Sequence, residues 1–155
     1  MKTIGITGGT GFVGHHLSKL LISKGYHVVI FTRGSRLQQP GAQISYAHWD
    51  AKKGVCDIKA LNSLDGILHL AGAGVADKRL TEARKKEIVD SRVDGTNFLV
   101  EQLRNHSPNC KTIIAASATG YYGPDTPGKI PFTETAPCYT DFLGSTCQAW
   151  ENATN

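Results

Sequence analysis

The chain has 155 residues, of which 40% are hydrophobic and 19% are charged, which is the size and composition of one globular domain and excludes an intrinsically disordered chain. The net charge of +4 is a mild excess that suits an anionic small ligand as well as nucleic acid and decides for neither. No apolar run approaches the roughly 18 residues of a membrane span, and the N-terminus has no signal-peptide core. We therefore expect a cytoplasmic protein without a membrane partner.

The four cysteines, at positions 56, 110, 138 and 147, are scattered along the chain. Because no pair has the Cys-x-x-Cys spacing, the sequence argues against a zinc site and against a thioredoxin-type redox motif. The six histidines form no metal-ligand pattern either, so no metal site is expected.

Short apolar runs alternate with longer amphipathic segments, which is typical of strands that alternate with helices. The expected strands are residues 3–7, 27–32, 43–47, 66–70 and 112–116. The expected helices are residues 12–24, 81–104 and 141–153, and the apolar face of the first is Val13, Leu17, Leu20 and Leu21. This alternation predicts an α/β fold, a Rossmann-like doubly wound parallel sheet of five strands in a three-layer α/β/α arrangement.

Residues 118–140 are dense in glycine and proline and are expected to form a loop. The loop is longer than compact domains usually contain without a functional reason, such as a lid or a binding loop.

Gly8, Gly11 and Gly14 follow the first expected strand at a spacing of three residues. In a dinucleotide site the first glycine allows a tight turn, the second a close approach of backbone N–H groups to a pyrophosphate, and the third close packing of helix on strand. The pyrophosphate then lies at the helix N-terminus. We predict that the cofactor contacts Gly8, Thr10, Gly11, Phe12 and Val13. A plain strand-to-helix turn is the alternative, but it needs one glycine rather than three.

The second expected strand ends in Thr-Arg-Gly-Ser-Arg, residues 32–36, without the acidic residue that accepts a hydrogen bond from the ribose of NAD. Arg33 is placed to bind a 2′-phosphate, and Ser35 and Arg36 are placed to add to that contact. The sequence therefore predicts NADP(H) in preference to NAD(H). The alternative is that the two arginines are solvated loop residues.

At the end of the fourth expected strand, Leu70, Ala71 and Gly72 are predicted to contact the cofactor, because small residues there let its ribose approach the backbone.

The glycine spacing resembles that of the extended branch of the short-chain dehydrogenase/reductase superfamily. Residues 72–82, 84–93, 117–123, 141–143 and 150–151 resemble an atypical branch of the NAD(P)-dependent epimerase/dehydratase family, labelled sugar-nucleotide epimerase or cell-division-inhibitor-like. This resemblance covers the whole chain. Together with the NADP(H) prediction from Arg33, it implies an oxidoreductase or epimerase that passes hydride between nicotinamide and an oxygen-bearing carbon of a small or nucleotide-linked substrate. It also implies that Asp50 contacts the adenine amino group.

Relatives of this branch carry a further strand and a C-terminal substrate-binding part. We therefore expect residues 1–155 to be the NAD(P)-binding domain without those parts. A sheet that lacks its last strand exposes an apolar edge, which makes a homo-oligomer compatible with the sequence.

The superfamily's usual chemistry needs an Asn, a Ser, a Tyr and a Lys four residues after the Tyr. Ser117 matches the Ser, whereas the Asn position falls on Arg92 and the Tyr and Lys positions fall on Leu143 and Cys147. The resemblance therefore preserves one of the four groups, and it implies that Ser117 orients the substrate.

Tyr121 and Tyr122 are the remaining candidates for the acid/base phenol. A phenol of pKa about 10 needs a cationic neighbour to act at neutral pH, for which Lys78, Arg79 and Arg92 are available. Alternatively both tyrosines only pack in the loop. Lys78 and Arg79 are predicted to bind a substrate anion or to be solvated.

A second functional class, a non-catalytic NADP(H)-binding regulator or sensor, is favoured by the missing Tyr and Lys. Nucleic-acid binding has only the net charge and the basic run 84–86 in its favour and is not expected.

Overall fold

The computed structural model describes residues 1–34, 41–125, 128 and 130–154. These residues form a six-stranded sheet in the order β4-β3-β2-β1-β5-β6. All neighbouring strands are parallel except β3 and β4, which pair antiparallel. The strands are β1 (Thr3–Thr7), β2 (His27–Thr32), β3 (Ile44–Asp50), β4 (Val55–Cys56), β5 (Gly66–His69) and β6 (Ile113–Ala115).

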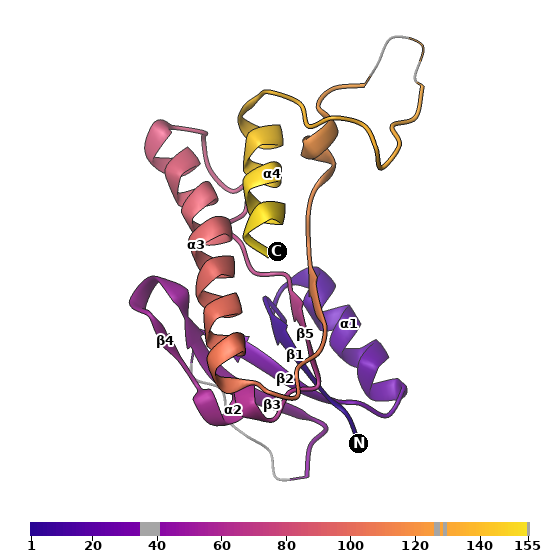
Figure 1. Cartoon of the computed structure of the whole chain (residues 1–155), viewed down its shortest axis with the longest axis vertical. Helices are drawn as coiled ribbons and strands as arrows, with labels where there is room; N and C mark the ends of the chain where they lie inside the picture. Colours follow the sequence, from indigo (N-terminus) through magenta and orange to yellow (C-terminus); the bar gives the residue numbers. More distant parts are fainter. Residues whose placement is uncertain (35–40, 126–127, 129, 155) are drawn as a thin grey trace.

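Helices cover both faces of this sheet, with α1 on one face and α3 on the other (Figure 1). The α-helices are α1 (Phe12–Ser23), α2 (Ile58–Asn62), α3 (Glu82–His106) and α4 (Phe142–Thr154), and the 3-10 turns are η1 (Ala51–Lys53) and η2 (Thr119–Tyr122). The predicted three-layer Rossmann-like α/β fold is therefore confirmed. No helix in the described ranges is both long and apolar enough to cross a membrane.

The core consists of two layers on opposite faces of the sheet. Val29 and Phe31 of β2 join Leu61 of α2 and Leu99 of α3 in one cluster, whereas Val28 and Ile30 belong to the other. Successive residues of β2 thus point to opposite faces and are buried on both. This explains why the strand is a continuous apolar run rather than an alternating one.

The expected strand 43–47 is in fact β3, Ile44–Asp50, and the short β4 and α2 were not predicted. The strand continues because the side chain of Trp49 packs into the core, and because Trp49 and Asp50 pair with β4. Asp57 then caps α2, its Oδ1 accepting a hydrogen bond from the backbone N of Ala60 at 3.0 Å. A helix of five residues is too short to show a helical period.

The predicted apolar face of α1 was half right: Leu17 is partly buried and Leu21 packs against the core, whereas Val13 and Leu20 do not. Val13 and Leu20 are 61% and 52% exposed, while Gly14 and Ser18 are the buried residues of the helix. A Cβ on Gly14 would lie 2.5 Å from the carbonyl oxygen of Gly8. The backbone of α1 therefore touches the preceding turn at Gly14, and this contact sets the rotation of the helix together with Leu21 and Ile22, which pack against the core.

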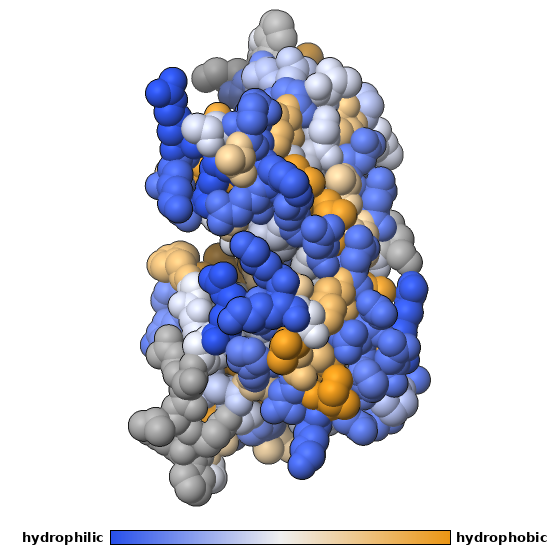
Figure 2. Space-filling model, turned by 90° about the vertical axis from the view of Figure 1, so that its left-hand side faces the viewer, coloured by the Kyte–Doolittle hydropathy of each residue, from blue (hydrophilic) through white to orange (hydrophobic). Residues whose placement is uncertain are grey.

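The solvent face of α3 is polar. Lys85 pairs with Glu82 at 2.8 Å and Lys86 pairs with Asp90 at 2.6 Å. Hydrophilic side chains predominate on this side of the molecule (Figure 2). The basic run 84–86 therefore shares its face with carboxylates.

The described residues between β6 and α4 are mostly irregular, as predicted, and extend away from the sheet beyond α4 (Figure 1). They include η2, and the ring of Tyr122 stacks on that of Phe132 with centroids 5.3 Å apart.

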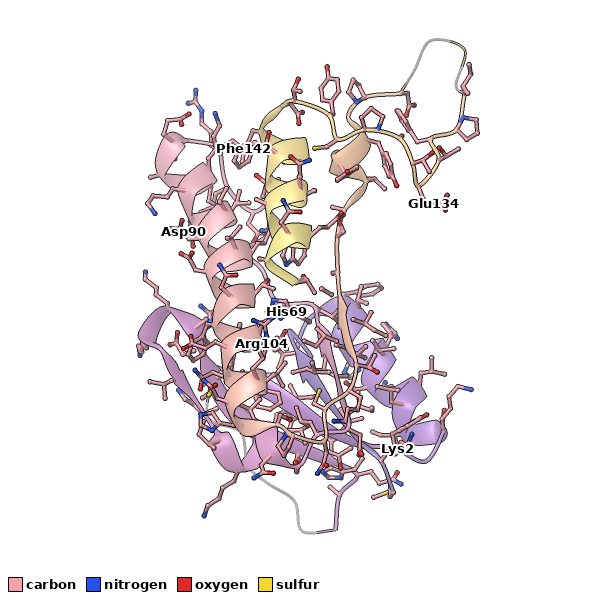
Figure 3. All side chains as sticks on the ribbon, viewed as in Figure 1. Lys2, His69, Asp90, Arg104, Glu134 and Phe142 are labelled. Carbon is pink, nitrogen blue, oxygen red and sulfur yellow. The ribbon has the colours of Figure 1, made fainter. Side chains whose placement is uncertain are left out.

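A buried polar chain connects β1, β5 and α3 through His69, near the centre of the molecule (Figure 3). Thr96 donates to the backbone oxygen of Arg92 at 2.5 Å, so its Oγ1 accepts from His69 Nε2 at 3.1 Å. His69 Nδ1 then accepts from Thr7 Oγ1 at 2.6 Å. Burial lowers the pKa of His69 to about 4, so the ring is neutral at pH 7.

Two helical glycines predict opposite effects of the same substitution. Gly14→Ala places a methyl group against the backbone of Gly8 and should lower the free energy of unfolding by about 1–3 kcal/mol. In α3, a Cβ on Gly95 would meet only Trp49, at 3.9 Å, so Gly95→Ala should raise that free energy by about 0.5–1 kcal/mol. Urea unfolding followed by circular dichroism measures both; equal stability of the two variants would contradict the packing described for α1.

The neutral His69 makes stability depend on pH. The unfolded ring takes up a proton near pH 6.5 and the folded ring only near pH 4, so between these values the unfolded state binds more protons and stability falls as pH falls. From pH 7 to pH 5 the expected contribution is about 2 kcal/mol. His69→Gln should lose that share of the pH dependence, while the exposed-site variant His48→Gln keeps it. Unfolding free energies at the two pH values provide the measurement.

Candidate functional site

The glycine turn lies at the carboxyl edge of the parallel strands, directly against the end of β5. Gly8 has a positive φ of 72°, and a Cβ there would lie 2.9 Å from the backbone N of Ala71. The backbone N of Gly11 donates to the carbonyl oxygen of Gly8 at 3.0 Å and closes the turn. The contact between the turn and β5 leaves no room for side chains at Gly8.

The N-terminus of α1 differs from the starts of the other helices. Asp57 and Thr81 cap α2 and α3, and Asp141 accepts from the backbone N of Gly144 at the start of α4. Gly11 supplies no side-chain cap to α1, and the first turn of α1 has no acidic residue. The first N–H groups of α1 are therefore available to an anion. The residues around this turn that are exposed are Thr10, Gly11, Phe12 and Val13.

Two predicted cofactor residues lie at the ends of the neighbouring strands. Arg33 follows β2 and is exposed, while Ser35 and Arg36 lie outside the described residues. Asp50 ends β3, and its carboxylate accepts from the backbone N of Lys53 at 3.3 Å. Asp50 thus caps η1 in this structure, and its contact with adenine remains a prediction.

The end of β5 is tied to β1. The backbone N of Leu70 donates to the carbonyl oxygen of Thr7 at 3.1 Å, and that of Ala71 donates to Thr7 Oγ1 at 3.4 Å. Since Thr7 also bonds His69, the buried polar chain fixes the segment 70–72 beside the glycine turn. Sequence reasoning did not identify this role of His69, although a lone histidine in the apolar run 66–70 is a visible signal.

Ser117, two residues beyond β6, is exposed and donates to Glu151 Oε1 of α4 at 2.5 Å. The bond joins residues 34 positions apart in the sequence, so the spacing of the motif did not predict it. The structure therefore adds Glu151 to the candidate site as the hydrogen-bond acceptor of Ser117.

Tyr121 and Tyr122 lie in η2, with ring centroids 5.3 Å apart. Burial raises the pKa of the Tyr121 phenol, and Cys138, Glu151 and Tyr122 raise it further. These contributions are opposite in sign to that of a cationic neighbour. In this structure the Tyr121 phenol therefore stays protonated at neutral pH and is suited to donate a proton rather than to accept one.

Leu143 and Cys147 pack beneath η2 on α4. A Cβ on Gly120 would lie 3.2 Å from Leu143 Cβ and 3.9 Å from Cys147 Sγ. Burial raises the pKa of the Cys147 thiol. Where the resemblance places a phenol and an ammonium group, the chain therefore has packing side chains.

Lys78 and Arg79 are exposed in the segment that follows β5. Buried Arg84 holds this segment to α3, donating to the carbonyl oxygen of Gly74 at 2.5 Å and pairing with Glu87 at 2.6 Å. The charge of Arg84, and to a smaller degree that of Lys78, lowers the pKa of Glu87. The charge of Lys78 is thus felt by Glu87 on α3.

The chain is similar in sequence to known epimerase-family proteins. Residues 4–142 match the NAD dependent epimerase/dehydratase family. The epimerase family protein YfhF of Bacillus subtilis is 36% identical over 149 residues, which cover 96% of this chain and 48% of YfhF. The chain thus spans about half the length of the curated relatives that it matches.

Solved structures show the same fold. A nucleoside-diphosphate sugar epimerase from Corynebacterium glutamicum, 34% identical, superimposes with a TM-score of 0.76 over 99% of this chain and 30% of that one. The human epimerase family protein SDR39U1, solved with NADPH, is 24% identical, with a TM-score of 0.75 over 99% of this chain and 48% of its own. The family match spans well over half of the chain and agrees with the glycine turn and the strand order: the chain belongs to the NAD-dependent epimerase/dehydratase family.

Proposed function

We propose that residues 1–155 are the NADP(H)-binding domain of an oxidoreductase or epimerase that acts on a small or nucleotide-linked carbonyl or hydroxyl substrate. The observation that carries this proposal is the uncapped N-terminus of α1 behind a glycine turn that touches β5. Membership of the family and the NADPH in the human relative's structure support it. The substrate-binding part would belong to the additional length of the longer relatives.

The residues present fit a dinucleotide. The N–H groups of Phe12 and Val13 would hold the pyrophosphate, while Gly8, which has no room for a Cβ, keeps the turn against the end of β5. Arg33 would bind the 2′-phosphate, and the segment 70–72 would lie beside a ribose. Asp50 retains carboxylate lone pairs beyond its bond to Lys53, and these would accept from the adenine amino group.

The nicotinamide, when bound, supplies hydride transfer. On the protein side, Ser117 would hold the substrate oxygen in two ways: its lone pairs accept from a substrate hydroxyl while its O–H donates to Glu151, and the O–H turns from Glu151 to a substrate carbonyl oxygen. Glu151 already accepts the Ser117 proton in a hydrogen bond and orients that hydroxyl. Tyr121, whose raised pKa keeps the phenol protonated, would serve as a proton donor in the reducing direction.

A second candidate function is a cofactor-binding regulator or sensor without chemistry. Leu143 and Cys147 favour it, because they pack beneath Gly120 and place no titrating pair at the usual positions. Consumption of NADPH with a carbonyl substrate would count against it.

Cofactor preference tests the first part of the proposal. NADPH should bind more tightly than NADH, and Arg33→Ala should weaken NADPH binding by roughly tenfold while leaving NADH almost unchanged, since a charge-assisted contact to an exposed phosphate is lost. Equilibrium titration by calorimetry measures both ligands, and Arg104→Ala, on the far end of α3, is the matched control. Equal binding of the two cofactors would show that Arg33 does not contact the 2′-phosphate.

Ser117→Ala tests the chemical part. It should leave the Kd for NADPH unchanged and reduce turnover with carbonyl substrates by about 100-fold or more, as for the loss of a group that positions a proton transfer. The assay is NADPH oxidation at 340 nm with UDP-linked keto sugars. The protein assayed is this chain fused to the C-terminal part of one of its longer relatives. Undiminished turnover removes Ser117 from the mechanism.

A further inference from the structure

Arg92 of α3 is half-buried at the carboxyl edge of the sheet, next to the predicted nucleotide site. Its NH1 donates to the carbonyl oxygens of Ala73 at 2.9 Å and Ile88 at 3.2 Å. Its guanidinium carbon lies 5.0 Å from the centre of the Trp150 ring. These contacts fix the plane of the guanidinium group and use both hydrogens of one terminal nitrogen.

The neighbouring cations of α3 all have carboxylate partners, but Arg92 has none within the described part of the chain. Arg84 pairs with Glu87 and Asp77, and the two lysines that follow it pair with Glu82 and Asp90. Burial lowers the pKa of Arg92, Cys147 offsets part of that shift, and the charge of Arg84 adds to it. A half-buried cation without a counter-ion is unfavourable, so this position favours an anion.

The geometry also indicates the shape of that anion. Among the described residues no group accepts a hydrogen bond from Nε or NH2 of Arg92. These two nitrogens form the edge of a guanidinium group that binds two oxygens of one carboxylate or phosphate. Gly72 packs against this group: a Cβ there would lie 3.3 Å from the guanidinium carbon and 3.4 Å from NH1, so a side chain at position 72 would crowd Arg92.

The charge distribution links Arg92 to the Ser117–Glu151 pair. Both Arg92 and Glu151 act on the pKa of the Cys147 thiol, Arg92 lowering it and Glu151 raising it. Cys147 therefore lies within electrostatic range of both. The same link is geometric: Arg92 packs on the ring of Trp150, and the next residue of α4, Glu151, accepts the hydrogen bond of Ser117.

We propose that Arg92 is an oxyanion subsite that binds a carboxylate or phosphate group of the substrate. This inference rests on the proposed function, because it names the class of substrate for the same site. The substrate is then an anionic sugar or a sugar phosphate rather than a neutral carbonyl compound. Arg92 selects it by charge and by the paired geometry of the two oxygens.

The experiment follows the Nε–H signal of Arg92 and the indole N–H signal of Trp150 by NMR in the whole chain, with and without saturating NADPH. The probes are D-glucuronate against neutral D-glucose, and UDP against uridine. Each anion shares its scaffold with its neutral counterpart. A response to glucuronate identifies a carboxylate ligand and a response to UDP a phosphate ligand; both support the subsite.

Arg92→Gln should raise the Kd of the responding anion, read from the Trp150 indole, by about tenfold or more, which corresponds to about 1.4 kcal/mol. Arg92→Lys keeps the charge but not the paired donors. Its Kd for the anion should therefore lie between that of the parent chain and that of Arg92→Gln. Arg104→Gln, farther along the same helix, should leave the Kd unchanged. The NADPH affinity of Arg92→Gln shows whether the nucleotide site stays intact.

Three results would overturn the proposal: no anion shifts the two signals, Arg92→Gln binds the anion as well as the parent chain, or NADPH itself occupies Arg92 and excludes both anions. If NADPH does not bind while an anion still responds at Arg92, the proposed cofactor function fails and the subsite stands. The two failures are thus distinguishable.

Discussion

The backbone contact between α1 and the turn after β1 determines the geometry of the proposed nucleotide site. Gly14 faces the carbonyl oxygen of Gly8 at a distance that excludes a side chain, so the helix starts directly behind the strand. The same rotation turns Phe12 and Val13 outward, although they are apolar. Close packing at one glycine thus determines which residues surround the first N–H groups of the helix, and it leaves these apolar side chains at the proposed nucleotide site rather than in the core.

A second constraint is the buried polar chain from Thr7 to Thr96. Neutral His69 links two strands with α3, and the backbone oxygen of Arg92 accepts the last bond of the chain. The side chain of Arg92 starts from the same helical turn. The network that fixes the carboxyl ends of the strands therefore also positions the guanidinium group beside them. The proposed nucleotide site and the proposed substrate subsite thus depend on the same hydrogen bonds.

The sequence predicts features that local chemistry determines and misses those that distant contacts determine. The five parallel strands and the glycine turn were predicted because buried strands are β-branched runs and tight turns need glycine. The length of β3 was missed because it depends on Trp49 packing under α3 and on the pairing with β4. Within the site, Ser117 was named from its motif, whereas its bond to Glu151 depends on how α4 lies beside β6.

The missing cap on α1 has a consequence for folding itself. The first N–H groups of the helix have no side-chain partner, so an anion that binds there supplies part of the helix's own stabilisation. Ligand binding and folding are then thermodynamically linked, and a nucleotide present at 100 times its Kd adds about 2.7 kcal/mol to the native state. The chain should therefore become more resistant to proteolysis as the nucleotide concentration around it rises.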